Sequence, residues 1–225
     1  MPKGKLYDNL KQVLIMIQCE MEKSEDGEIQ KYYGVGGFLL EIIKVVLLAF
    51  IIIVPIRVFL FQPFFVQGAS MEPNFEDSNY LIVNELGYKK TSFNLEGKNF
   101  FTIAPFKKLQ RGEVVVFKYP KNHSQFFIKR IIGLPGEKIE IKNGQVRIYN
   151  LDNPNGTTLD EKSYLDKSIK TAGETVLTLK DNAYFVLGDN RMFSSDSRSW
   201  GPVLDSEIIG KVILRAWPLD EAGVF

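Results

Sequence analysis

Three stretches of this 225-residue sequence combine residue types that can carry out nucleophilic chemistry. Ser70 lies in "GASMEP", Lys129 lies in "FIKRIIGLPGE", and residues 187–201 read "LGDNRMFSSDSRSWG". A serine hydroxyl is a weak nucleophile until a nearby base accepts its proton. The first question is therefore which side chain could serve as that base for Ser70.

The sequence offers two candidates for the base. It contains one histidine, His123, in the polar turn "PKNHSQ", where an exposed loop side chain is the simplest interpretation. Lys129 is the second candidate, because a strand would place Phe127 and Ile131 on its own face and apolar burial lowers a lysine pKa. Lowering that pKa from ~10.4 to about 7–8, as a base requires, disfavours the charge by about 4 kcal/mol. A lysine that points to water remains open from the local pattern.

The third stretch is rich in small polar and charged residues. They include Gly188, Asp189, Asn190, Ser194, Asp196 and Arg198. Such a set can form a loop held by ion pairs, with a hydroxyl such as that of Ser194 holding the lysine amine. A solvated surface loop is the other interpretation.

The elements that would position these residues are mostly strands. Short runs such as "GEVVVFKYP", "QFFIKRIIGL", "AYFVLGD" and "GKVILRAWPL" are rich in Val, Ile, Phe and Tyr and are bounded by Gly, Pro, Asn or Asp. "EIKNGQVRIY" predicts a hairpin that turns at Asn143-Gly144. "DSEIIGKV" suggests a short helical turn, and segments 87–109 and 150–174 are expected to be loops or insertions. The predicted fold class is mainly β, an antiparallel sheet or partly closed barrel.

A long apolar segment precedes this body. Phe38–Phe61 contains 24 residues, enough to cross a hydrocarbon core of about 30 Å with some tilt. Its uncharged run, Val45–Ile56, has only 12 residues, so an amphipathic or buried helix is the alternative. The predicted organisation is an N-terminal tail (1–36), a transmembrane anchor helix (37–61) and a β-rich catalytic domain (62–225).

Basic residues predict the orientation of the anchor. Six lysines precede it or lie at its start: Lys3, Lys5, Lys11, Lys23, Lys31 and Lys44. After Arg57 no Lys or Arg occurs before Lys89. This bias predicts a single-pass protein of the cytoplasmic membrane, with a cytoplasmic N-terminus and the catalytic domain on the outer face.

Composition limits the other possibilities. The formal net charge of +1 argues against nucleic acid binding, which usually requires a basic excess. Cys19 is the single cysteine, so an intrachain disulfide and a Cys-rich metal site are both excluded. We expect no metal and no other cofactor.

Taken in order behind the apolar segment, "SMEP", "KRIIGLPGE" and "GDNRMFSSDSR" resemble the type I signal peptidases, which are membrane-bound Ser/Lys proteases. The resemblance extends over about residues 38 to 217. It implies that Ser70 is the nucleophile, that Lys129 is the general base, and that Ser194 supports the lysine amine. It also implies that ion pairs hold the site together, through Asp189, Arg130, Asp196 and Arg198.

The resemblance implies a substrate as well. Exported preproteins would bind as extended strands at the bilayer surface, with small residues at the first and third positions before the cut. Five residues are expected to line shallow apolar pockets for them: Phe64, Val66, Met71, Phe127 and Ile128. Some type I signal peptidases carry a serine two residues before the nucleophile, and this sequence has Gly68 at that position. The resemblance then implies the backbone N–H of Ser70 as one hydrogen-bond donor to the oxyanion, and the identity of a second donor is left open.

Two other classes of function stay open. A relative with the same Ser/Lys pair could be a self-cleaving repressor. Such repressors are soluble and carry a DNA-binding region, so the apolar segment argues against this possibility. A specialised maturation peptidase is also compatible with the sequence. A membrane-tethered β module without catalysis is the third class, and the presence of both Ser70 and Lys129 argues against it.

Overall fold

The computed structural model describes residues 35–59, 61–88, 91–95 and 98–225, and all structural statements below refer to these residues. The chain divides into two compact units, residues 1–50 and 51–225. The predicted N-terminal tail, residues 1–36, lies outside the described residues apart from its last two.

Helix α2 (Val35–Phe59) occupies the segment predicted to be the anchor. Between Phe38 and Ile53 its large apolar side chains are 44% to 67% exposed. Among the described residues, however, no helix combines the length and the apolar character that a membrane crossing requires. The helix is therefore present, whereas the prediction of a transmembrane span over residues 37–61 is not confirmed.

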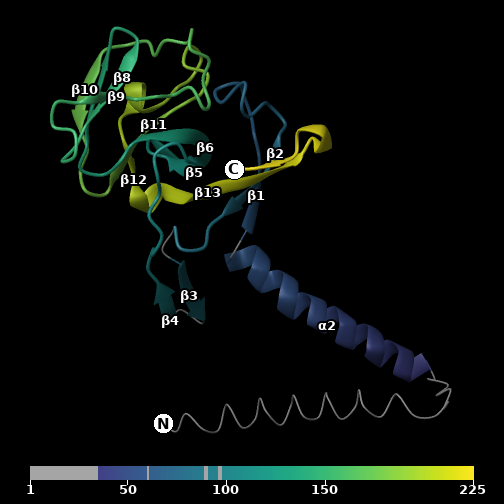
Figure 1. Cartoon of the computed structure of the whole chain (residues 1–225). Helices are drawn as coiled ribbons and strands as arrows, with labels where there is room; N and C mark the ends of the chain where they lie inside the picture. Colours follow the sequence, from purple (N-terminus) through teal and green to yellow (C-terminus); the bar gives the residue numbers. More distant parts are fainter. Residues whose placement is uncertain (1–34, 60, 89–90, 96–97) are drawn as a thin grey trace. The chain divides into compact units, whose positions relative to one another are not determined.

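The main sheet has the order β1-β2-β13-β5-β6-β11-β12, with β14 paired to β13 (Figure 1). Its strands are β1 (Phe61–Phe65), β2 (Tyr80–Asn84), β5 (Val114–Tyr119), β6 (Asn122–Gly133), β11 (Ala183–Leu187), β12 (Val203–Leu204), β13 (Ile208–Trp217) and β14 (Gly223–Val224). All these pairings are antiparallel, as predicted. The prediction of a partly closed barrel was wrong, because within the described residues the sheet stays open. Its path ends on the two-residue strand β12, which offers little edge for β1 to pair with.

A second sheet has the order β10-β7-β8-β9. It consists of β7 (Lys138–Lys142), β8 (Gln145–Tyr149), β9 (Thr157–Thr158) and β10 (Thr175–Thr178). Asn143 and Gly144 join β7 to β8 with φ values of 53° and 79°. These left-handed values are what a two-residue hairpin turn requires, so the predicted Asn-Gly turn is confirmed.

Segment 87–109 was expected to be a loop or an insertion, and it contains a hairpin of β3 (Thr91–Leu95) and β4 (Lys98–Ile103). Aromatic and β-branched residues in "TSFNL" and "KNFFTI" favour the two strands. Three short helices complete the body: α3 (Ser197–Trp200), η1 (Asp205–Glu207) and η2 (Leu219–Glu221). η1 matches the helical turn predicted at "DSEIIGKV".

The core explains the uninterrupted apolar run of β5. Val114 and Val116 pack in one buried cluster with the residues around β1 and β2. Val115 and Phe117 point to the other face and pack in a different cluster with β6 and β11. Because both faces of β5 are buried, the strand is apolar at successive positions. This doubly covered centre of the sheet is the rigid support beside which the candidate site is built.

Candidate active site

Ser70 lies in the connection from β1 to β2. The next residue, Met71, is fully buried together with Phe75, and the Phe75 amide donates to the Met71 carbonyl at 3.0 Å. Both side chains belong to the apolar cluster beneath β1 and β2. This one-turn segment is thus anchored by two core residues, and Ser70 stands half-buried at its start.

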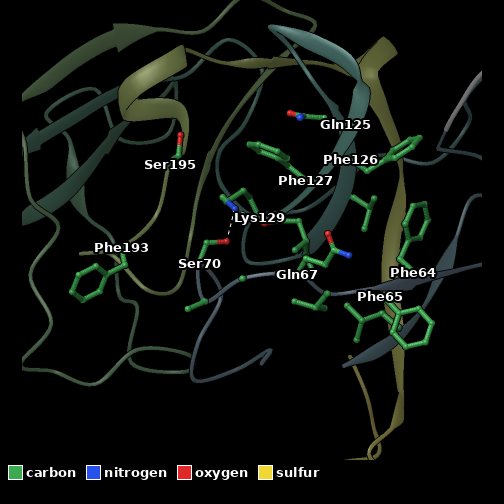
Figure 2. Close-up of a pocket in the computed structure, with 16 residues that line it drawn as sticks. Phe64, Phe65, Gln67, Ser70, Gln125, Phe126, Phe127, Lys129, Phe193 and Ser195 are labelled. Carbon is green, nitrogen blue, oxygen red and sulfur yellow. Dashed lines mark hydrogen bonds between the residues drawn. The ribbon is translucent and has the colours of Figure 1, made fainter. Parts of the chain in front are cut away.

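Lys129 comes from the middle of β6 and is 3% exposed. Its Nζ lies 2.7 Å from Ser70 Oγ and also donates to the Ile128 carbonyl oxygen at 2.8 Å (Figure 2). The ring of Phe127 covers the amine, with its centroid 5.5 Å from Nζ. The structure therefore brings together the two side chains that the sequence nominated, with the amine buried beneath the Phe127 ring.

Burial controls the charge of Lys129. It lowers the pKa of the amine to about 8, against the opposing effect of the Asp196 and Asp189 carboxylates. About a tenth of the amine is then neutral at pH 7. A neutral amine can accept the hydroxyl proton of Ser70, which an ammonium group cannot do.

Asp189, two residues after the end of β11, is fully buried and forms a bidentate pair with Arg130. Arg130 donates from Nε at 2.8 Å and from Nη2 at 2.5 Å, while its Nη1 donates to the Gly112 carbonyl at 2.8 Å. Asn74 adds a hydrogen bond to Asp189 Oδ2 at 2.9 Å. Since Arg130 follows Lys129 and Asn74 belongs to the Ser70 segment, Asp189 holds together the two elements that carry the pair.

Asp196 is the second buried carboxylate of this loop. It accepts hydrogen bonds from Nε and Nη2 of Arg198, both at 2.8 Å, and from the Gly188 amide at 3.1 Å. It also caps helix α3. The resemblance implied ion pairs among these four residues without assigning partners, and the structure shows two pairs: Asp189 with Arg130 and Asp196 with Arg198.

Ser194 lies close to the nucleophile segment but not on the amine. Its buried Oγ has no hydrogen-bond partner among the described residues. A Cβ added to Gly188 would lie 2.1 Å from this Oγ and 2.4 Å from the Ser70 carbonyl oxygen. Glycine is therefore required where the loop passes between Ser194 and Ser70, and the support of Lys129 by Ser194 stays a prediction.

Two residues of the "GDNR" run hold the site in ways that the sequence analysis missed. The amide of Asn190 donates to the Ser70 carbonyl at 3.1 Å, and its Nδ2 donates to the Ala69 carbonyl at 2.9 Å. Arg191 is buried, and its Nε donates to the Gly188 carbonyl oxygen at 3.0 Å. Its guanidinium forms an ion pair with the Glu161 carboxylate. The motif itself marked Asn190 and Arg191, but nothing in the expected loop at 150–174 marked Glu161 as a partner.

A cleft of about 670 Å³ opens beside the Ser70–Lys129 pair (Figure 2). Four of the five predicted pocket residues line it: Phe64, Val66, Phe127 and Ile128. The fifth, Met71, does not line it and was wrongly placed there. Its side chain points into the core, because the one-turn segment that exposes Ser70 directs the following residue inward.

Gly68 has a φ of +85°, a left-handed value that favours glycine. Its amide donates to Asp77 Oδ1 at 2.7 Å, and this hydrogen bond lowers the pKa of the Asp77 carboxyl. The Gly68 amide is therefore already engaged and is not free to replace the missing side-chain oxyanion donor. His123 lies away from the cleft lining, with a 62% exposed side chain and Nε2 at 3.1 Å from Glu207 Oε1.

Residues 39–217 match the family model described as "Signal peptidase, peptidase S26". The chain belongs to this family. Signal peptidase IB of Staphylococcus aureus is 32% identical over 194 residues, which cover 81% of this chain and 92% of that protein. A probable signal peptidase I-2 of Synechocystis sp. is 32% identical over 190 residues, covering 82% and 76% respectively. A crystal structure of a signal peptidase I from Enterococcus faecalis V583 covers 47% of this chain and 97% of its own, with 34% identity and a TM-score of 0.38.

Membership of the S26 family makes the chain a serine peptidase. Two of the three motifs singled out in the sequence bear directly on the geometry: "GASMEP" carries Ser70, and "FIKRIIGLPGE" carries Lys129. The third, the Gly-Asp-Asn-Arg box, supplies the loop that ties the other two together through Asp189 and Asn190.

Proposed function

We propose that this S26 peptidase removes N-terminal signal peptides from exported preproteins, with Ser70 as the nucleophile and Lys129 as the general base. The observation that carries the proposal is the 2.7 Å approach of the buried Lys129 amine to Ser70 Oγ. A lysine pKa of about 8 supports the base role, because a working general base needs a pKa near the operating pH.

The reaction follows from this geometry. Neutral Lys129 accepts the Ser70 proton as Oγ attacks the carbonyl carbon of the scissile bond. The backbone N–H of Ser70 donates a hydrogen bond to the oxyanion that forms. The ammonium of Lys129 then returns the proton to the departing amine, which leaves an ester between Ser70 and the signal peptide. A water molecule that gives a proton to Lys129 then attacks this ester. Lys129 passes that proton to the departing Oγ of Ser70, and the signal peptide leaves as a free acid.

The cleft favours an extended substrate. β1 lies at the edge of the main sheet, and Phe64, Phe65 and Val66 line the cleft beside it. A substrate strand added here would use main-chain hydrogen bonds for affinity. The rings of Phe64 and Phe127 leave shallow apolar pockets, which suit small residues at the first and third positions before the cut.

Cleavage of a preprotein tests this function. The detergent-solubilised chain, mixed with a preprotein that has alanine at both of these positions, should give one new N-terminus immediately after the second alanine. Ser70→Ala should give no product, whereas His123→Ala should cut at the wild-type rate because His123 lies outside the cleft lining. Cleavage by Ser70→Ala at the wild-type rate, or loss of cleavage in His123→Ala, contradicts the assignment.

We infer further that helix α2 attaches the enzyme to a lipid bilayer. Its apolar side chains are exposed along the helix from Phe38 to Ile53, and large exposed apolar surfaces usually mark an interaction site. Single-pass topology with a cytoplasmic N-terminus is part of this proposal. A tag at the N-terminus that resists external protease while residues 62–225 are digested would support it, and release of the chain by alkaline carbonate would contradict it.

A further inference from the structure

An exposed aromatic ring, that of Phe193, stands at the edge of the cleft. Phe193 belongs to the Gly-Asp-Asn-Arg loop and is 79% exposed, yet it lines the cleft together with Ser195. In Figure 2, Phe193 and Phe65 lie on opposite sides of Ser70. Because Phe193 lines the same cleft as Phe64 and Phe127, its ring is placed to contact a substrate bound beside Ser70.

The position of Phe193 is fixed relative to the nucleophile. Its amide donates to the Asn190 carbonyl at 3.1 Å, and the Asn190 amide donates in turn to the Ser70 carbonyl at 3.1 Å. Arg198 braces the same loop by donating from Nη2 to the Arg191 carbonyl at 2.9 Å. Because the backbone is already ordered, a substrate would lose little binding energy in ordering this loop.

The direction in which the substrate chain runs through the cleft determines which of its residues contact Phe193. An extended peptide advances about 3.3 Å per residue, so the residues on the two sides of the scissile bond occupy opposite sides of Ser70. The proposed function places the signal-peptide residues beside Phe64 and Val66. The first residues of the mature protein must then leave across Ser70, toward Phe193 and Ser195.

We propose that Phe193 binds the first two residues after the cut and selects apolar side chains there. This inference rests on the proposed function, which supplies the direction of the substrate in the cleft. Burying apolar surface between the ring and a leucine or phenylalanine side chain stabilises the complex. A glycine or serine at the same positions offers no such surface.

Two peptide series test the inference. Both have the same sequence up to the cut, and the two following residues are Leu-Phe in one series and Gly-Ser in the other. Phe193→Ala should lower kcat/KM about 10-fold for the Leu-Phe series and leave the Gly-Ser series unchanged. Met192→Ala is the matched control, because Met192 is 70% exposed on the same loop but does not line the cleft. It should leave both series unchanged.

A methyl ester of the same signal-peptide segment separates substrate binding from a structural role. Its leaving group is too small to reach Phe193, so Phe193→Ala should react with it at the wild-type rate. Equal losses on both peptide series and on the ester, or no loss on the Leu-Phe series, overturn the inference alone. A wild-type enzyme that cuts neither the peptides nor the ester overturns the proposed function and the inference with it.

Discussion

Replacing Lys129 with methionine lowers the rate of peptide cleavage by about 10⁴-fold, the range expected when a general base is removed from a hydroxyl nucleophile. Methionine keeps an apolar side chain of similar length in the buried site, so the packing against Phe127 survives. The free energy of unfolding should stay unchanged or rise, because a desolvated amine has been removed. Rapid-mixing kinetics with a preprotein peptide measures the first effect, and urea unfolding in detergent measures the second.

Lys129→Arg tests whether the site needs a neutral amine or only a cation. Arginine retains a cation and hydrogen-bond donors, but its guanidinium stays protonated and cannot accept the Ser70 proton. It should therefore be as inactive as Lys129→Met. Substantial activity in Lys129→Arg would show that the cation matters rather than the free amine, and would contradict the role of Lys129 as base.

Removing Arg130 should have the largest effect on stability. Asp189 is fully buried, and Arg130 provides its bidentate partner from the neighbouring strand. Arg130→Ala leaves that carboxylate buried without its ion-pair partner, and breaking a buried pair from one side costs about 3–5 kcal/mol. The midpoint of urea unfolding should shift accordingly.

Two controls identify the cause of that loss. Lys162→Ala removes the exposed pair with Asp160 and should give no measurable shift. Arg130→Met combined with Asp189→Leu removes both charges and should recover most of the stability lost in Arg130→Ala. If Arg130→Ala unfolds at the wild-type midpoint, the ion pair does not hold the β6 and β11 segments together.

The core of the site was accessible from sequence because its signals are local. Strand alternation around Lys129 predicted an apolar face. The order of three short motifs along the chain resembled one family pattern that includes Ser70, Lys129 and the acidic loop. The antiparallel β class followed from short runs of Val, Ile, Phe and Tyr, and the Asn143-Gly144 turn followed from the left-handed conformations that these two residues tolerate.

Features that depend on tertiary contacts were not accessible in this way. Met71 was expected to line the pocket, but the direction of its side chain is set by packing beneath β1 and β2. The pair of Arg191 with Glu161 joins residues 30 positions apart across a segment expected to be a loop. The open sheet is a similar case, because closure depends on the lengths of the two edge strands rather than on any local pattern.

The pH dependence of the acylation rate is the most direct test that the neutral amine of Lys129 is the base. Only neutral Lys129 can accept the Ser70 proton, so the acylation rate constant should rise with pH along a single titration curve and level off above a midpoint of about 8. The same curve is expected for His123→Ala. A rate that does not change between about pH 6.5 and 9.5, or a midpoint near 6.5 that disappears in His123→Ala, would contradict the account.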